Sequence, residues 1–218
     1  MFKKEKSNKL KFFLLPLFGE KLFCDVDHKT RSIFIHIPKT AGVSVSQALY
    51  GREIGHRRAK YLKTYNPYMF QKYFKFGFVR NPWDRMVSAF WFLKKGGANK
   101  NDKKWASKYL ASFKDFHDFV LSLKYKKQVN RVLKWHHFKP QWEYICDDDL
   151  QILLDYVGRF EKLVSDFENV KNTLNIACEL PYFNYGDHRY YRKYYNWETK
   201  EIVSSLYKQD IELFNYYF

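Results

Sequence analysis

Two short segments of the chain combine residue types that can bind phosphate groups. The first, residues 36–44, reads H-I-P-K-T-A-G-V-S and lies between a strand-like run and the start of a helical spacing. A loop that leads into a helix presents unpaired backbone N–H groups, and the helix dipole adds a partial positive charge, so an anion is favoured there. The segment offers one cation, two hydroxyls and three further loop residues: Lys39, Thr40, Ser44, Ala41, Gly42 and Val43.

This loop differs from the Walker pattern G-x-x-x-x-G-K-[ST], because it has fewer glycines and its lysine precedes the glycine. Taken alone, it is equally compatible with an ordinary strand-to-helix connection. A phosphate site therefore needs support from a second part of the chain.

The second segment, residues 78–90, reads F-V-R-N-P-W-D-R-M-V-S-A-F. Arg80 comes at the end of an expected strand, where side chains of an open α/β sheet face the ligand crevice. Ser88 follows about two turns into the next helix. A guanidinium fork and a hydroxyl can hold a second phosphate, although Arg80 could instead form a structural ion pair with Asp84. The two segments together are more specific for a nucleotide than either one.

The elements that must position these residues follow from hydrophobic periodicity. Strands are predicted in 33–37, 74–79 and 150–160, and helices from about 45, over 82–95, after a cap at Ser112, over 164–177 and over 199–214. Residues 96–104 are predicted to form a mobile polar loop and 181–196 a Tyr-rich loop. Strands that alternate with helices predict an α/β fold with a parallel sheet covered on both faces.

The overall composition sets broader limits. The 218 residues suit one domain, and the net charge of +16 favours nucleic acid, an anionic nucleotide or an acidic glycan as partner, with solubility alone as the other reading. The three cysteines are far apart and form no Cys/His cluster, so neither a disulfide framework nor a zinc site is indicated. Reduced thiols favour a cytoplasmic location.

The two phosphate motifs resemble the 5′-phosphosulfate loop and the 3′-phosphate motif of the sulfotransferase family, in the branch that includes the carbohydrate sulfotransferases. The likeness extends from about Arg31 to the end of the chain. It implies a sulfotransferase domain over 31–218, with a three-layer fold similar to P-loop kinases, and leaves 1–30 as an N-terminal segment with a docking role, of which residues 1–19 are expected to form a strand or docking segment. The apolar run within 12–18 is too short to span a bilayer, so membrane association is limited to peripheral contact.

The resemblance also implies a donor, 3′-phosphoadenylyl sulfate (PAPS), and a product, adenosine 3′,5′-bisphosphate (PAP). Residues 39–44 are then expected to surround the 5′-phosphosulfate. Arg80 and Ser88 would hold the 3′-phosphate, and the C-terminal loop with Arg192 and Lys193 would close over the nucleotide. No metal is expected, because a lysine and a helix terminus can carry the developing charge.

A hydroxyl acceptor also needs a general base. A histidine between the two motifs is near the acceptor in related enzymes, so His56 is the predicted base, against the alternative of a surface histidine among basic neighbours. Glu53, His136 and His137 are the reserves. His136, His137 and Gln141 are predicted to contact the acceptor, although this stretch could merely pack Trp135 and Trp142 into the core.

The sequence thus predicts a sulfotransferase that acts on a hydroxyl group of a glycan, with no nucleic-acid partner. An ATP-dependent P-loop kinase is the first alternative, but it would need a Walker glycine pattern and an acidic magnesium ligand. A non-catalytic polyanion-binding module is the second, and it would leave the paired phosphate motifs unexplained. The acceptor's identity and the oligomeric state do not follow from the sequence.

Overall fold

The computed structural model describes residues 23–181 and 190–218 and is built on a parallel three-stranded sheet. The strands β1 (Ser32–Ile35), β2 (Phe74–Val79) and β3 (Tyr156–Arg159) lie in that order, with Ile35 opposite Gly77 and Gly77 opposite Val157. All four residues of β1 are buried. A strand that is buried on both faces reads as a continuous apolar run, which is why the sequence pattern located it. The predicted α/β class with a parallel sheet is confirmed.

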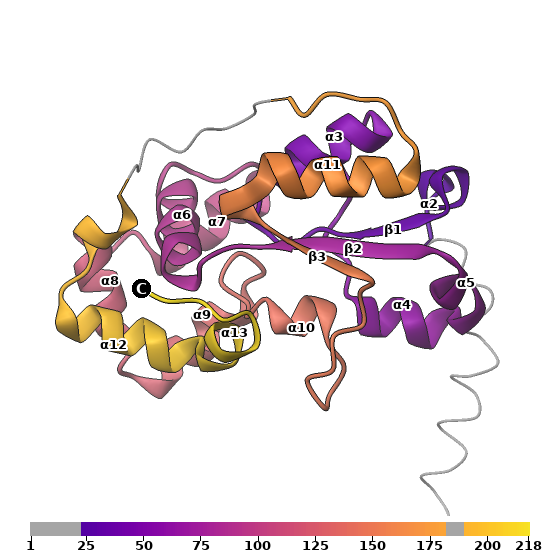
Figure 1. Cartoon of the computed structure of the whole chain (residues 1–218). Coiled ribbons are helices and arrows are strands. Elements are labelled where there is room, and N and C mark those ends of the chain that lie inside the picture. The colour runs from indigo at the N-terminus through magenta and orange to yellow at the C-terminus, as the bar shows by residue number, and fades with distance from the viewer. Residues whose placement is uncertain (1–22, 182–189) are drawn as a thin grey trace, which may run out of the picture.

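Helices cover both faces of this sheet (Figure 1). Helices α3 (Gly42–Tyr50) and α11 (Leu163–Leu174) lie over one face, and α4 (Ala59–Tyr65), α5 (Pro67–Lys72) and α10 (Trp142–Ile145) lie on the other side. Between the sheet and the first pair, three phenylalanines pack against apolar residues of the two helices: Phe34, Phe76, Phe78, Val45, Phe167 and Val170.

A second group of helices lies beyond the ends of the strands (Figure 1). It comprises α6 (Pro82–Lys94), α7 (Lys100–Tyr109), α8 (Phe116–Ser122), α9 (Lys126–Lys134), α12 (Trp197–Leu206) and α13 (Lys208–Leu213), with the short 3-10 helices η1 (Phe160–Lys162) and η2 (Tyr191–Tyr194). Helix α6 starts at Pro82, which suits the first turn, and the Asn81 side chain caps it by accepting from the N–H groups of Trp83 and Asp84. The buried hydrophobic side chains of α6 belong to the hydrophobic core that the sheet shares with this group of helices.

Several predicted elements differ from the structure. The loop expected over 96–104 gives way to α7 at Lys100, because the Asn99 side chain caps that helix. The helix expected after Ser112 begins at Phe116 and is capped by Asp115. The closing helix expected over 199–214 is two helices, which meet at Tyr207.

The N-terminal part of the described chain is helical. Helix α2 (Asp25–Thr30) contacts β1. The strand or docking segment expected over 1–19, and half of the Tyr-rich loop expected over 181–196, fall outside the described residues.

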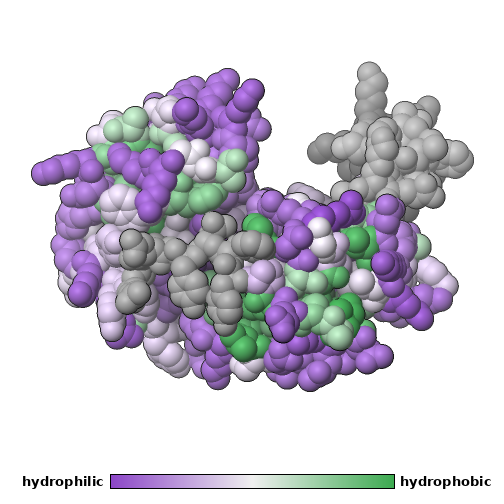
Figure 2. Space-filling model, turned by 90° about the horizontal axis from the view of Figure 1, so that it is seen from above, coloured by the Kyte–Doolittle hydropathy of each residue, from purple (hydrophilic) through white to green (hydrophobic). Residues whose placement is uncertain are grey.

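The face above the sheet is mixed in polarity: Figure 2 shows hydrophobic side chains grouped among hydrophilic ones. Val164 of α11, for example, is 57% exposed. Across residues 23–181 and 190–218, none of the helices combines the length and apolarity that crossing a bilayer requires.

Candidate active site

The loop between β1 and α3 is held in an unusual backbone conformation. Lys39 has φ 71° and Ala41 has φ 63°, so two non-glycine residues occupy the left-handed region, which costs about 1 kcal/mol or more for each. Two contacts fix this shape: the Thr40 hydroxyl donates to the Ile37 carbonyl at 2.9 Å, and Arg80 Nη1 donates to the Lys39 carbonyl at 3.0 Å. The two phosphate motifs therefore meet in the fold.

Helix α3 begins at Gly42, which has no side chain. A Cβ atom at this position would lie 1.9 Å from Cδ2 of His36, so the imidazole occupies the space that any side chain would need. The His36 Nδ1 contacts the Ile54 carbonyl at 2.7 Å, which fixes the ring there. Within residues 23–181 and 190–218, no side chain caps the N-terminus of α3. Its first N–H groups can therefore meet an anion directly, and the buried hydroxyls of Thr40 and Ser44 lie in the same turn.

The Lys39 ammonium lies over the Phe92 ring of α6, with Nζ 3.8 Å from the ring centroid. Burial, together with the positive charge of Arg80, lowers the pKa of Lys39 to about 8 against the opposing effect of the Asp102 charge. A buried cation with a reduced proton affinity gains most from a negatively charged ligand. This supports the role predicted for Lys39.

Arg80 is held from several sides. Its Nε donates to Asp84 Oδ2 at 2.8 Å, so the ion pair raised as an alternative is present, and its guanidinium stacks on Phe160 at 3.9 Å from the ring centroid. Only 7% of Arg80 is exposed, and Ser88 on α6 is equally buried. An arginine fixed this firmly is preorganised for an anion and loses little freedom when one binds.

Gln141 has a different role from the one expected. It is fully buried, its Oε1 accepts from the Arg80 N–H at 2.9 Å, and its Nε2 donates to the Arg80 carbonyl at 2.8 Å. The Asp210 carboxylate in turn accepts from the backbone N–H groups of Gln141 and Trp142. With both amide groups used in this way, Gln141 holds the backbone of Arg80 in the predicted donor site, and the prediction that Gln141 contacts the acceptor is corrected.

Four histidines form a cluster beside the loop that contains Lys39 (residues 36–44), which is called the donor loop because it is predicted to bind the sulfuryl donor. The ring centroids of His36 and His56 are 4.2 Å apart, those of His56 and His136 are 5.3 Å apart, and those of His136 and His137 are 4.0 Å apart. The cluster reaches the donor lysine through Phe92, whose ring lies 4.8 Å from that of His137. The predicted base and the two histidines predicted to contact the acceptor are therefore brought together.

His56 has a defined tautomer when it is neutral. Its Nδ1 is 2.9 Å from the His36 carbonyl, and a carbonyl can only accept, so Nδ1 carries the hydrogen and Nε2 carries the lone pair. Desolvation by the surrounding protein lowers the pKa of His56 against the opposing effects of the His36 carbonyl and of the Glu53 and Asp102 charges, although the residue keeps an exposed edge. A neutral imidazole with a bare nitrogen can accept a proton.

Asp102 is the residue of this cluster that the sequence did not reveal, because it falls in the segment predicted as a loop. It is 1% exposed, and its Oδ1 lies 3.1 Å from His137 Nε2 and 3.9 Å from His136 Nε2. Burial raises the pKa of Asp102, but hydrogen bonds from His137 and the Ala98 N–H outweigh this and lower it overall. Burial also lowers the pKa of His137, and that of His136 to about 4.

The remaining predicted residues lie near the edge of the site. Arg192 and Lys193 are exposed on η2, which packs against α6, and Arg192 donates to the Phe218 carbonyl at 3.0 Å. The Asn81 amide donates to the Tyr191 hydroxyl, so η2 is joined to the residue that follows Arg80. Glu53 is exposed. The predicted roles of these three charged residues stay predictions.

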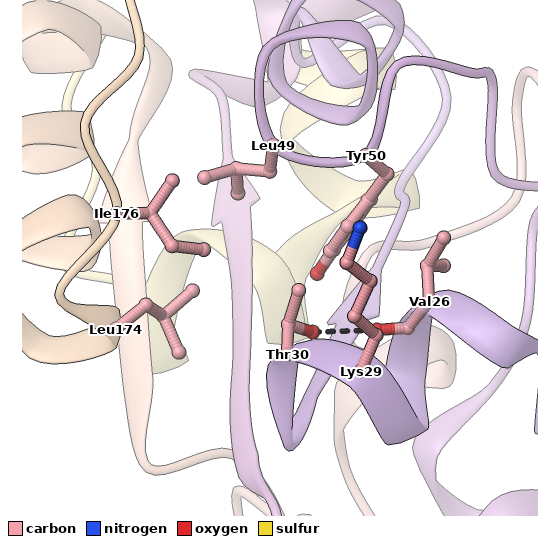
Figure 3. A pocket seen from close by; sticks show the side chains of 7 residues that line it. All are labelled: Val26, Lys29, Thr30, Leu49, Tyr50, Leu174 and Ile176. Carbon is pink, nitrogen blue, oxygen red and sulfur yellow. Dashed lines mark hydrogen bonds between the residues drawn. The ribbon is translucent and has the colours of Figure 1, made fainter.

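A pocket of about 410 Å³ lies elsewhere, at the far end of α3 (Figure 3). It is lined by Val26, Lys29, Thr30, Leu49, Tyr50, Leu174 and Ile176. Leu49 and Tyr50 end the helix that Gly42 begins, so a helix rise of roughly 10 Å separates this pocket from the donor loop. Its lining offers one cation and four hydrocarbon side chains, from α2, α3 and the end of α11 and the residues after it, which does not suit a nucleotide.

Comparison with known proteins identifies one family. The family model described as "Sulfotransferase family" matches residues 23–217 of the chain. Neither the curated proteins nor the solved structures gave a match.

Proposed function

The chain belongs to the sulfotransferase family, and from this membership we propose that it transfers the sulfuryl group of PAPS to a hydroxyl group of a glycan, with His56 as the general base. The observation that carries the proposal is the hydrogen bond from Arg80 to the Lys39 carbonyl. It joins the two motifs expected at the two phosphate ends of one nucleotide.

The donor loop supplies the groups that a 5′-phosphosulfate needs. The N-terminus of α3, which no side chain of the described residues caps, provides N–H donors, and the absence of a side chain at Gly42 leaves room for the His36 ring that packs beside it. Arg80 and Ser88 would hold the 3′-phosphate, a group that ATP lacks. PAPS, when bound, supplies an activated sulfuryl group, and the chain's own residues position it and offset its charge.

Lys39 and His56 have different roles in the proposed reaction. In the proposed transfer a bond forms between the acceptor oxygen and sulfur while the bond from sulfur to the 5′-phosphate oxygen breaks. The acceptor proton passes to His56 Nε2, and Lys39 stabilises the charge that develops on the leaving oxygen. The His36 carbonyl holds the Nδ1–H of His56, so the base keeps its orientation when it becomes an imidazolium.

Helix α4, which follows His56 in the chain, carries an exposed aromatic side chain that is compatible with a sugar acceptor. Tyr61 on α4 is 55% exposed, and the guanidinium carbon of Arg58 lies 5.5 Å from its ring centroid. An exposed ring can stack on a sugar face, and the net charge of +16 favours an acidic one. These features support a glycan over a small apolar alcohol.

Two experiments test this proposal. In calorimetric titrations PAP should bind without Mg²⁺ and ATP should bind weakly, whereas binding of ATP-Mg²⁺ alone would indicate a kinase and salt-sensitive binding of polyanions alone would indicate a polyanion module. Transfer of labelled sulfate from PAPS to a panel of glycans then identifies the acceptor.

The base is tested with two substitutions of His56. His56→Ala should lower kcat by roughly 10²–10⁴-fold and leave PAP affinity unchanged. His56→Asn keeps an N–H donor for the His36 carbonyl but cannot accept the proton, so it should lose as much activity as the alanine variant. Recovery of activity in the asparagine variant would show that His56 only supports the structure.

A further inference from the structure

We propose that Asp102, His136 and His137 form a binding site for a divalent transition ion of the Zn²⁺ type, on the acceptor side of the active site. Their ligand atoms, one from each residue, all lie within 4.8 Å of one another. The sequence offered no metal-binding spacing, because the carboxylate comes from α7 and the two imidazoles follow α9.

The distances suit a tetrahedral ion. Zn²⁺ binds nitrogen and oxygen ligands at about 2.0–2.2 Å, so two ligands at the tetrahedral angle are about 3.3 Å apart. Asp102 Oδ1 lies 3.1 Å from His137 Nε2 and 3.9 Å from His136 Nε2, which brackets that spacing. The His136 side chain is 33% exposed. An ion can therefore enter from its side, and a water molecule can complete the coordination.

The carboxylate is oriented for this role. Asp102 Oδ2 accepts from the Ala98 N–H at 3.1 Å and from Asn99 Nδ2 at 3.2 Å, while Oδ1 faces the two imidazoles. Gly97 packs so closely that a Cβ atom there would lie 2.1 Å from the Asp102 Cβ. Hydrogen bonds to the non-ligating oxygen are typical of carboxylates that bind metals.

The ligand set also selects the kind of ion. Two imidazoles and one carboxylate match the three protein ligands of open zinc sites, and Cu²⁺ would be accepted as well. Mg²⁺ and Ca²⁺ need more oxygen ligands than this set provides.

One feature limits the affinity. His137 Nδ1 is buried without a hydrogen-bond partner in the described part of the chain, and it would carry the ring proton once Nε2 bound the ion. Because such a missing partner typically weakens a metal site by about 10–100-fold, we expect binding in the micromolar range.

The ion would inhibit transfer, a consequence that rests on the proposed function. The ring centroid of His56 is 5.3 Å from that of His136, so an ion bound to His136 would lie beside the proposed base and occupy space intended for the acceptor. Zn²⁺ would then regulate the enzyme as a reversible inhibitor.

Metal binding is measured first by calorimetry, with ZnCl₂ alone and untagged full-length protein freed of metal by chelation. The expected result is one ion per chain, lost at least about 50-fold in Asp102→Asn and in His136→Ala. His117→Ala, a histidine on α8 outside the cluster, is the matched control and should bind as the wild type does. Thermal unfolding of each variant verifies that it is folded.

Co²⁺ provides a second readout, since a tetrahedral ion with nitrogen ligands has strong visible absorption that both ligand variants should abolish. Equal Zn²⁺ binding in the wild type and the ligand variants, or no binding below millimolar Zn²⁺, would overturn the site. If Zn²⁺ binds as expected but sulfate transfer is not inhibited, the site stands and the role given to His56 fails.

Discussion

The low proton affinity of Lys39 makes binding of PAP dependent on pH. With a pKa of about 8, half of the free protein carries a neutral Lys39 at pH 8. A bound nucleotide phosphate beside Nζ favours the charged form and raises this pKa. Binding must therefore take up protons from solution, and the uptake equals the fraction of Lys39 that is neutral before binding.

The expected uptake follows from that single pKa. If the bound state is fully protonated, uptake is about 0.1 proton at pH 7, about 0.5 at pH 8 and about 0.9 at pH 9. Between pH 7 and pH 9 the Kd for PAP should rise roughly tenfold, which is about 1.4 kcal/mol. The sign is fixed because Lys39 loses its charge as pH rises, so binding weakens toward alkaline pH.

The assay is calorimetric titration with PAP in pairs of buffers that differ in ionisation enthalpy, since the difference in observed heat gives the number of protons taken up. The phosphates of PAP are fully ionised above about pH 7.5 and do not contribute there. Histidines of the cluster would give uptake that grows toward acidic pH, the opposite trend.

Lys39→Arg is the matched control because its guanidinium stays charged throughout this range. This variant should bind PAP with a Kd that is constant from pH 7 to pH 9 and should take up no proton. Proton uptake near zero at pH 8 in the wild type would refute the assignment of Lys39 to the nucleotide phosphates. Equal uptake in wild type and variant would assign the protons to another group.

Three further substitutions test the donor site. Arg80→Lys should weaken PAP binding by roughly 10–100-fold while leaving 5′-AMP binding nearly unchanged, because only PAP carries the 3′-phosphate that the fork holds; a parallel loss for both nucleotides in calorimetry would contradict this. Gly42→Ala should lower the free energy of unfolding by about 1–3 kcal/mol through its clash with His36, whereas Gly55→Ala, with nothing within 4 Å of the added Cβ, should be neutral in thermal unfolding. Gln141→Leu should weaken PAP binding at least tenfold, since it leaves buried backbone groups of Arg80 unpaired; a rise in acceptor KM alone would restore the original expectation for Gln141.

The two segments of the predicted donor site could be located from the sequence because the patterns that mark them lie within short stretches of the chain. The strand predicted over 74–79 has those same bounds in the structure, since a run rich in aromatic residues is followed, after Arg80, by Asn81-Pro82. The loop over 36–44 could be placed between a strand and a helix for the same reason. What local patterns could not provide was the contact between them, because the hydrogen bond from Arg80 to Lys39 joins residues 41 positions apart.

The segment before α7 shows where local patterns mislead. Gly96 and Gly97 precede a run of polar residues, and such a composition is typical of a loop. The structure nevertheless forms a helix from Lys100, because Asn99 caps it and Trp105 and Ala106 bury its apolar side in the core. Tertiary burial overrides weak propensity here, and the error concealed Asp102.

The acceptor half depends on such long-range contacts almost entirely. His137 meets Asp102 across 35 positions, and its backbone carbonyl accepts from Arg85 Nη1 at 3.2 Å across 52 positions. Arg85 is 1% exposed and also donates to the backbone carbonyl of Lys139. One buried guanidinium therefore sets the path of the segment that carries the two histidines. The same helix, α6, carries Phe92 against Lys39. Helix α6, which carries Ser88 of the predicted 3′-phosphate motif, therefore also positions the segment that holds His136 and His137. The sequence could predict these histidines by residue type, but it could not predict the contact of His137 with Asp102, because the two residues lie far apart in the chain.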